Sequence, residues 1–225
     1  MNVLITGGAG FLGLQLARLL LQRGALQLDG KAVAIDRLTL LDVVAPQIDD
    51  ARVRVVTGDL SDPAVLAQAI DRDTGAIFHL AAVVSGQAEA DFDLGMRVNL
   101  DASRALLETC RRIGHAPRVV FTSSVAVYGG ELPPVVQDDT ALNPQSSYGV
   151  QKAIGELLLS DYSRRGFVDG RVLRLPTISV RPGKPNAAAS SFASGIIREP
   201  LSGIAANCPV APDTALWLLS PRGAI

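Results

Sequence analysis

The sequence of 225 residues is poor in the side chains that build metal centres and disulfide frameworks, with two cysteines and two histidines. Cys110 and Cys208 lie far apart in the chain and in no metal-binding spacing, and no His-Glu-x-x-His motif or Cys/His cluster occurs. These absences argue against a disulfide-stabilised secreted domain and fit a reducing compartment. The sequence also predicts no metal site.

An excess of charge and long apolar runs are missing as well. The 21 basic residues are balanced by 22 acidic ones, which leaves a formal net charge of −1 and no basic surface for nucleic acid. No run approaches the ~18 apolar residues of a membrane span, and no basic region precedes the first apolar stretch. We therefore expect a cytoplasmic protein that binds neither nucleic acid nor a membrane.

Apolar stretches that are typical of buried strands alternate with stretches that are typical of helices, which indicates an α/β protein with a doubly wound parallel sheet. The predicted strands lie at residues 3–5, 32–35, 52–57, 76–80, 118–122 and 171–175. The predicted helices lie at residues 11–23, 62–71, 98–113 and 147–165. After residue 175, prolines interrupt every run, so we expect a smaller second lobe over residues 176–225.

The first predicted strand leads into a glycine-rich turn over residues 6–13, and the turn leads into a helix. Its sequence, TGGAGFLG, fits both G-x-G-x-x-G and T-G-x-x-G-x-x-G. Glycine permits positive φ and close approach of a ligand, and the N–H groups of the following helix point at any bound anion. The turn therefore predicts a dinucleotide site formed by Gly7, Gly10, Phe11, Leu12 and Gly13.

An acidic residue about 20 residues beyond such a turn, at the end of the second strand, usually binds the adenosine ribose. Asp36 follows the predicted strand at 32–35 and fits this role. Its carboxylate would accept hydrogen bonds from both ribose hydroxyls and repel a 2′-phosphate, so we expect NAD as the cofactor. Arg37 leaves NADP open, because a guanidinium there could receive the phosphate.

Tyr148 and Lys152 lie four residues apart at the start of the last predicted helix, on one face of it. A nearby ammonium favours the phenolate and would lower the pKa of the tyrosine from about 10, so that it can take a proton from a substrate hydroxyl. Ser124 follows a predicted strand, at the sheet edge where ligands bind, and could hold the substrate oxygen. Each pattern alone is also typical of a solvated helix face or an ordinary turn.

Two expectations concern the core. His79 lies in a predicted buried strand, where we expect a core histidine bonded to the backbone rather than a catalytic base. The residues expected to seat the last helix on the sheet are Val150, Ile154, Leu157 and Leu158.

Taken together, the motifs resemble those of the extended short-chain dehydrogenase/reductase family, over residues 2 to about 182. The stretches that carry the resemblance are 6–13 (TGGAGFLG), 58–60 (GDL), 79–82 (HLAA), 98–99 (VN), 123–129 (SSVAVYG) and 148–152 (YGVQK). It implies a Rossmann-type NAD-binding domain over residues 1–175 and a substrate-binding lobe over residues 176–225. Homodimers, often formed through the two long helices, are common in this family.

The resemblance also implies roles for individual residues. Tyr148 would be the catalytic acid/base, Lys152 would lower its pKa and bind the nicotinamide ribose, and Ser124 would orient the reacting oxygen. The implied cofactor contacts are Asp59 and Leu60 beside the adenine, Ala81 and Ala82 along the cofactor channel, and Asn99 as support for the site.

The stretch over residues 173–195 resembles a branch of the family that acts on short polyhydroxy acids. The implied reaction is NAD-dependent oxidation of the C2 hydroxyl of D-erythronate to the 2-oxo acid. We expect Ser85, Thr177 and Arg181 to face the substrate, with Arg181 bound to its carboxylate. The open alternatives are a nucleotide-sugar epimerase that retains NAD and a non-catalytic NAD-binding protein. Family members usually have about 300 residues or more, so we also expect the substrate-binding lobe to be incomplete.

Overall fold

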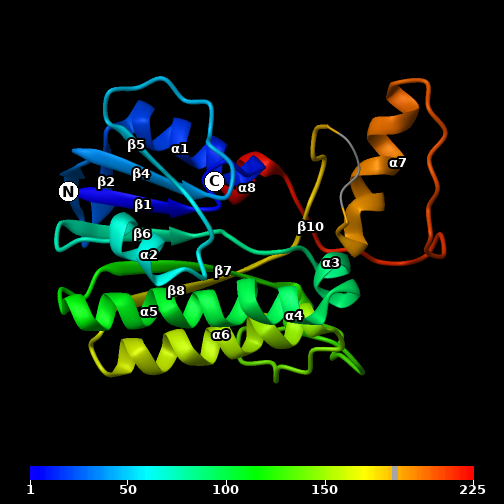
Figure 1. Cartoon of the computed structure of the whole chain (residues 1–225). Helices are drawn as coiled ribbons and strands as arrows, with labels where there is room; N and C mark the ends of the chain where they lie inside the picture. Colours follow the sequence, from blue (N-terminus) through cyan, green and yellow to red (C-terminus); the bar gives the residue numbers. More distant parts are fainter. Residues whose placement is uncertain (184–186) are drawn as a thin grey trace.

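The computed structural model describes residues 1–183 and 187–225 and is built on a six-stranded parallel sheet (Figure 1). The strands of this sheet are β1 (Asn2–Thr6), β4 (Arg37–Asp42), β5 (Val53–Thr57), β6 (Thr74–His79), β7 (Arg118–Ser124) and β8 (Asp169–Leu175). Their order is β5-β4-β1-β6-β7-β8, so the chain reverses direction across the sheet between β1 and β6. This is the doubly wound order of the Rossmann fold, and the predicted fold class is confirmed.

Helices cover both faces of the sheet. One face carries α1 (Phe11–Arg23), and the other carries α2 (Pro63–Ala69), α5 (Ala102–Ile113) and α6 (Ser147–Arg164). In β1, Leu4 packs into the core beneath α2, α5 and α6, whereas Val3 and Ile5 pack into the core beneath α1. Neighbouring side chains of a strand point to opposite faces, so an uninterrupted apolar strand fits a sheet buried on both sides.

The helix ends follow local signals in the sequence. Gly24 ends α1 in the left-handed conformation at φ 67°, which glycine adopts without strain. The Asp62 carboxylate accepts the N–H of Ala64 at 2.8 Å and caps α2. Before α5 the chain passes through the short helices α3 (Ser85–Ala90) and α4 (Phe92–Gly95) and a π-helical turn, η1 (Met96–Asp101). The predicted helices at 11–23 and 147–165 are confirmed to within one residue.

The prediction that residues 32–35 form the second strand of the central sheet is wrong. This stretch belongs to an antiparallel hairpin of β2 (Ala25–Leu28) and β3 (Lys31–Ala34) outside the sheet. The strand next to β1 is β4, in a stretch where neither a strand nor a helix was predicted. Its residues Leu38, Thr39, Leu40 and Leu41 are all buried, whereas β3 is mostly exposed. Burial on both faces therefore selects β4 for the sheet.

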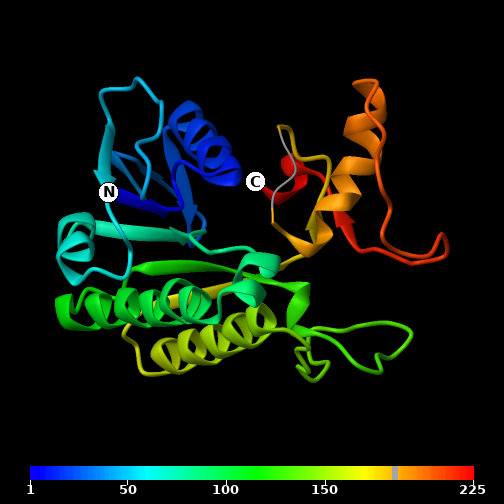
Figure 2. The same ribbon diagram turned by 45° about the vertical axis from the view of Figure 1, so that its right-hand side comes forward.

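The residues after β8 lie beyond the carboxyl ends of the strands (Figure 2). They form β9 (Thr177–Ile178) paired with β10 (Leu218–Leu219), the helices α7 (Phe192–Leu201) and α8 (Pro221–Ala224), and the 3-10 turn η3 (Ala189–Ser191). Ile225 packs against the core beneath α1. The end of β8 coincides with the predicted division at residue 175, which stays a prediction.

Residues 184–186 lie outside the described residues, although they belong to the stretch 173–195 that predicted the substrate class. Within residues 1–183 and 187–225, no helix combines the length and apolar character needed to cross a membrane.

Candidate active site

A cavity of about 920 Å³ lies at the carboxyl ends of the strands. The glycine turn, the segments after β6 and β7, the start of α6 and the chain after β8 all contribute to its wall. The predicted site residues that line it are Gly7, Gly10, Phe11, Leu12, Gly13, Ala82, Ser85, Ser124, Tyr148, Lys152, Thr177 and Arg181. Those that do not line it are Asp36, Asp59, Leu60, Ala81 and Asn99. The fold thus brings the predicted catalytic and substrate residues together.

The glycine turn forms a close-packed cradle. Gly7 has φ 71°, and a Cβ at Gly13 would lie 2.1 Å from the carbonyl oxygen of Gly7. No side chain caps the amino end of α1, and its first turn holds no acidic residue. The first residues of α1 line the cavity, and their N–H groups have no capping side chain, which fits the diphosphate of a dinucleotide.

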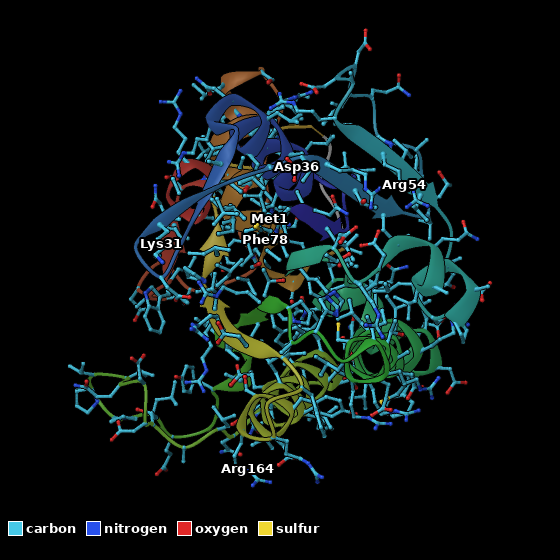
Figure 3. The ribbon with its side chains drawn as sticks, turned by 90° about the vertical axis from the view of Figure 1, so that its left-hand side faces the viewer. Met1, Lys31, Asp36, Arg54, Phe78 and Arg164 are labelled. Carbon is cyan, nitrogen blue, oxygen red and sulfur yellow. The ribbon has the colours of Figure 1, made fainter. Side chains whose placement is uncertain are left out.

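Asp42, rather than Asp36, lies where the ribose-binding carboxylate is expected. Asp42 ends β4, and its Oδ2 accepts the N–H of Ala9 in the glycine turn at 2.9 Å. Asp36 lies at the amino edge of the sheet, where it pairs with the amino group of Met1 at 2.5 Å (Figure 3). The position predicted for Asp36 is therefore wrong, because the hairpin delays the second central strand by several residues.

The neighbours of these two carboxylates agree with this correction. Arg37 pairs with Asp71 at 2.5 Å and is the first residue of β4, at the opposite end of that strand from Asp42. Asp59 follows β5, next to Gly58, whose N–H donates to the carbonyl of Asp42. Asp59 does not line the cavity. Leu60 beside it is buried in the core.

Lys152 is buried beneath the cavity floor, with 2% of its surface exposed. Its Nζ donates to the carbonyl of Thr122 at 2.9 Å and lies 5.7 Å from the centre of the Tyr148 ring. Burial lowers the pKa of Lys152 to about 8. The Lys152 ammonium thus lies over the ring of Tyr148, the residue four positions before it with which the sequence pattern paired it.

Burial raises the pKa of Tyr148 and is the largest influence on that pKa. A hydrogen bond with Ser124 and the positive charge of Arg181 act in the opposite direction. The expected net lowering of the pKa by Lys152 is therefore not seen, because desolvation of the phenolate outweighs the favourable contacts. The Ser124 hydroxyl lies beside the Tyr148 phenol, and its role in holding a substrate oxygen stays a prediction.

Asn99 lies behind the cavity wall, on the π-helical turn η1. Its side chain accepts the N–H of Val83 at 2.9 Å and donates to Gln151 at 2.8 Å. Asn99 and Gln151 are both buried. The pair holds the segment after β6 against α6, next to Lys152. The sequence reasoning missed Gln151, since a polar residue on an amphipathic helix is normally assigned to its solvent face.

A second buried polar network supports the end of β7. Glu156 accepts hydrogen bonds from Ser123 and from Arg174, which it meets at 2.8 Å. Arg174 in turn donates to the hydroxyl of Tyr128 and to the carbonyl of Asp138 at 3.1 Å. The ion pair raises the pKa of Arg174. These contacts join α6 and β8 to the segment that follows the 3-10 turn η2 (Val125–Val127).

This network also explains an error in the predicted packing of α6. Val150 and Leu157, which were expected to face the sheet, are 41% and 67% exposed. The buried face carries Gln151, Lys152, Ala153, Gly155, Glu156 and Leu159 instead. Polar side chains with buried partners thus occupy the face that a hydrophobic pattern would assign to apolar ones.

The side of the cavity beyond β8 holds the predicted substrate residues. Ser85 accepts the N–H of Ala189 at 3.1 Å, and Thr177 donates its N–H to the carbonyl of Trp217. Arg181 is partly buried, which lowers its pKa, and its charge interacts with Tyr148. Glu89, which the sequence reasoning did not select, also lines the cavity and accepts the N–H of Ser147 at 2.9 Å.

His79 is a buried core histidine, as predicted, although its partners are side chains. Nδ1 lies 2.7 Å from the Thr6 hydroxyl and Nε2 lies 2.9 Å from the Ser103 hydroxyl. Since Ser103 donates to the carbonyl of Asn99, its oxygen is left to accept from Nε2, which fits the neutral imidazole. Burial is the main reason that the pKa of His79 falls to about 3. In the described part of the chain, no group of His, Cys, Asp and Glu could hold a metal ion.

Known proteins match the chain over nearly its whole length. The model of the "NAD dependent epimerase/dehydratase family" matches residues 3–213. D-erythronate dehydrogenase from Cupriavidus necator is 91% identical over 100% of this chain and 70% of its own length, and that from Haemophilus influenzae is 54% identical over 99% and 69%. The chain thus spans about 70% of the length of these curated relatives.

Solved structures share the arrangement of the whole chain. A nucleoside-diphosphate-sugar epimerase from Agrobacterium tumefaciens has a TM-score of 0.89 at 48% identity, over 100% of this chain and 66% of its own. UDP-glucose 4-epimerase from Thermus thermophilus, in complex with NAD, has a TM-score of 0.81 at 25% identity, over 98% and 71%.

Proposed function

Because the chain belongs to the NAD dependent epimerase/dehydratase family, we propose that it is an NAD-dependent dehydrogenase that oxidises the C2 hydroxyl of D-erythronate to 2-dehydro-D-erythronate. The observation that carries this proposal is the shared cavity lined by Ser124, Tyr148, Lys152, Arg181 and the glycine turn. The identity to two D-erythronate dehydrogenases supports the substrate.

The cofactor site in this proposal combines three parts. The amide groups at the start of α1 bind the diphosphate. The Asp42 carboxylate accepts hydrogen bonds from the hydroxyls of the adenosine ribose, and Lys152 binds the nicotinamide ribose. NAD, when bound, supplies the hydride acceptor. The carboxylate of Asp42 would repel the 2′-phosphate of NADP, which favours NAD.

The reaction in this proposal removes a hydride from C2 and a proton from the C2 hydroxyl. Tyr148 takes the proton as its phenolate, and the Ser124 hydroxyl holds the same oxygen in place. In this proposal the positive charge of the buried Lys152, 5.7 Å from the centre of the Tyr148 ring, offsets part of the cost of forming the phenolate. The alcohol thereby loses two electrons and two protons and becomes the 2-oxo acid.

The substrate carboxylate in this proposal binds Arg181, whose planar guanidinium matches two carboxylate oxygens. Ser85 and Thr177 provide polar groups for the remaining hydroxyls. In a partly buried site a charge-assisted hydrogen bond contributes about 1.5–3 kcal/mol. Arg181 therefore distinguishes sugar acids from uncharged polyols.

The test is NADH formation by the purified protein with NAD and a panel of D-erythronate, L-threonate, uronates and UDP-sugars. We expect NADH with D-erythronate and its loss in Tyr148→Phe. Arg181→Met should raise the KM for the acid at least tenfold while the Kd of NADH changes less than twofold. No NADH with any acid would contradict the dehydrogenase.

The second candidate is a nucleotide-sugar epimerase with retained NAD, which the 48% identity to a protein of that name favours. It requires turnover of a UDP-sugar without net NADH and NAD that stays bound through purification. The same panel distinguishes the two functions, since the dehydrogenase consumes one NAD per substrate.

A homodimer through α5 and α6 is also part of this proposal. These helices lie side by side along one side of the molecule (Figure 1). On α6, Val150 and Leu157 are exposed. Leu157→Asp should convert the dimer to a monomer in sedimentation velocity. Leu201→Asp, on α7, is the matched control and should leave the dimer intact. A wild-type monomer at micromolar concentration would contradict the dimer.

A further inference from the structure

The segment that carries Arg181 is tied to α7 by three hydrogen bonds. Ser179 Oγ donates to the carbonyl of Ala193 at 3.0 Å. The N–H of Arg181 donates to Ser194 Oγ at 3.0 Å, and Arg198 Nη1 donates to the carbonyl of Arg181 at 2.6 Å. Both backbone groups of Arg181 are thus bound by side chains of one helix.

Ser194 and Arg198 lie four residues apart, so they share the face of α7 that meets this segment. Ser194 is 2% exposed and the side chain of Arg198 is 17% exposed. Glu199 pairs with Arg198 and neutralises its charge. A buried, neutralised arginine that donates to a backbone carbonyl serves to fix that carbonyl, and Arg198 does not line the cavity.

We propose that Ser194 and Arg198 are positioning residues for the substrate carboxylate, acting through the two backbone groups of Arg181. This inference rests on the proposed function, because it takes Arg181 as the ligand of the carboxylate. A guanidinium recognises a carboxylate through two parallel hydrogen bonds, which requires a fixed direction of approach. The side chain of arginine is long and flexible, and α7 fixes the backbone from which it enters the cavity.

The inference makes α7 a determinant of substrate affinity without contact to the substrate. Each hydrogen bond to Arg181 that is lost should raise the KM for D-erythronate about three- to tenfold, because the net effect of one hydrogen bond corresponds to a factor of this size. The Kd of NADH should change less than twofold, since the glycine turn and β4 make no hydrogen bond with α7 among the described residues.

The experiment compares Ser194→Ala, Arg198→Met, Arg198→Lys, Arg181→Met and the double variant Arg181→Met/Arg198→Met by steady-state kinetics, NADH titration and thermal unfolding. Arg164→Met is the matched control, because it removes an exposed arginine at the end of α6. We expect Ser194→Ala and Arg198→Met to raise the KM, Arg198→Lys to restore part of it, and the double variant to have the KM of Arg181→Met alone.

The double variant separates positioning from a merely structural role. If Arg198 acts through Arg181, its removal has no further effect on KM once the guanidinium is gone. Additive effects on KM in the double variant, or a KM within twofold of wild type in both Ser194→Ala and Arg198→Met, would overturn the inference while the proposed function stands. Wild-type protein without activity on sugar acids, or Arg181→Met with a normal KM, would overturn both this inference and the role of Arg181.

Discussion

The backbone N–H of Ala9 donates a hydrogen bond to Oδ2 of Asp42 at 2.9 Å. This contact joins the glycine turn to the carboxyl end of β4 and holds the carboxylate beside the start of α1. The diphosphate-binding amides and the ribose-binding carboxylate of the proposed NAD site are therefore fixed relative to each other by the protein itself.

Asp42→Ala should lower kcat/KM for NAD about tenfold and weaken the preference for NAD over NADP, because hydrogen bonds from the ribose hydroxyls to a carboxylate are lost together with the repulsion of the 2′-phosphate. Steady-state kinetics with both cofactors measure this. Asp36→Ala is the matched control, since Asp36 pairs with the amino terminus. The preference of this variant for NAD over NADP should equal that of the wild type. Equal effects of the two substitutions would contradict the assignment.

Tyr148→Phe should lower kcat about a thousandfold or more, because the proton of the C2 hydroxyl then lacks an acceptor. Binding of NADH, followed by its fluorescence, should persist. Tyr162→Phe provides the control: Tyr162 bonds to Glu108 on α5, away from the cavity, and its loss should leave kcat within twofold. A Tyr148→Phe protein with more than a tenth of wild-type kcat would show that another group takes the proton.

Glu156→Gln should destabilise the protein by about 3 kcal/mol, since it leaves the guanidinium of Arg174 without its buried partner. Urea unfolding measures the loss. Glu108→Gln provides the comparison with a more exposed ion pair, since Glu108 pairs with Arg111. This variant should lose less than about 1 kcal/mol of its free energy of unfolding. Similar losses in both variants would mean that burial does not set the strength of the Glu156 pair.

His79 should make the stability fall as the solution is acidified. Its pKa is about 3 in the folded chain against 6.5 ordinarily, so between these values the unfolded chain binds the extra proton and unfolding is favoured as the pH falls. The free energy of unfolding falls by up to about 1.4 kcal/mol for each pH unit. The accumulated loss from this histidine is about 2 kcal/mol at pH 5.

Urea unfolding at pH 7 and pH 5 compares the wild type with His79→Gln. The variant should lose about 2 kcal/mol less on acidification than the wild type does. The carboxylates of the two proteins are identical, so their contribution cancels in the comparison. An identical loss in both proteins would show that His79 takes up its proton without unfolding.

The fold could be predicted from the sequence where one local signal decided the structure. Gly24 ends α1, Asp62 caps α2, and the alternation of apolar strands with helices predicted the parallel sheet. The second central strand could not be predicted in this way, since residues 32–35 and 37–42 are both suited to strands. Which of them enters the sheet depends on burial between β1 and β5, a tertiary property.

The predicted site residues that the structure brings into one cavity lie at the ends of strands and at the start of α6, as with Ser124 and Tyr148, and their roles stay predictions. Buried polar partners were missed, because Gln151, Glu156 and Arg174 resemble surface residues when their partners are unknown. Asp42 carried a usable signal, since it directly follows a stretch with three leucines at 38, 40 and 41. The protonation of Tyr148 depends on desolvation, which only the folded cavity reveals.

The β2–β3 hairpin offers a practical consequence for handling the protein. Its turn at Asp29 and Gly30 has positive φ at both residues and lies at the surface. Figure 3 shows Lys31, the first residue of β3, on the side of the molecule where the strands begin. A peptide tag inserted at this turn would tether the protein to a sensor surface with the cavity turned toward the solution, so that immobilised protein can still be exposed to cofactor and sugar acid.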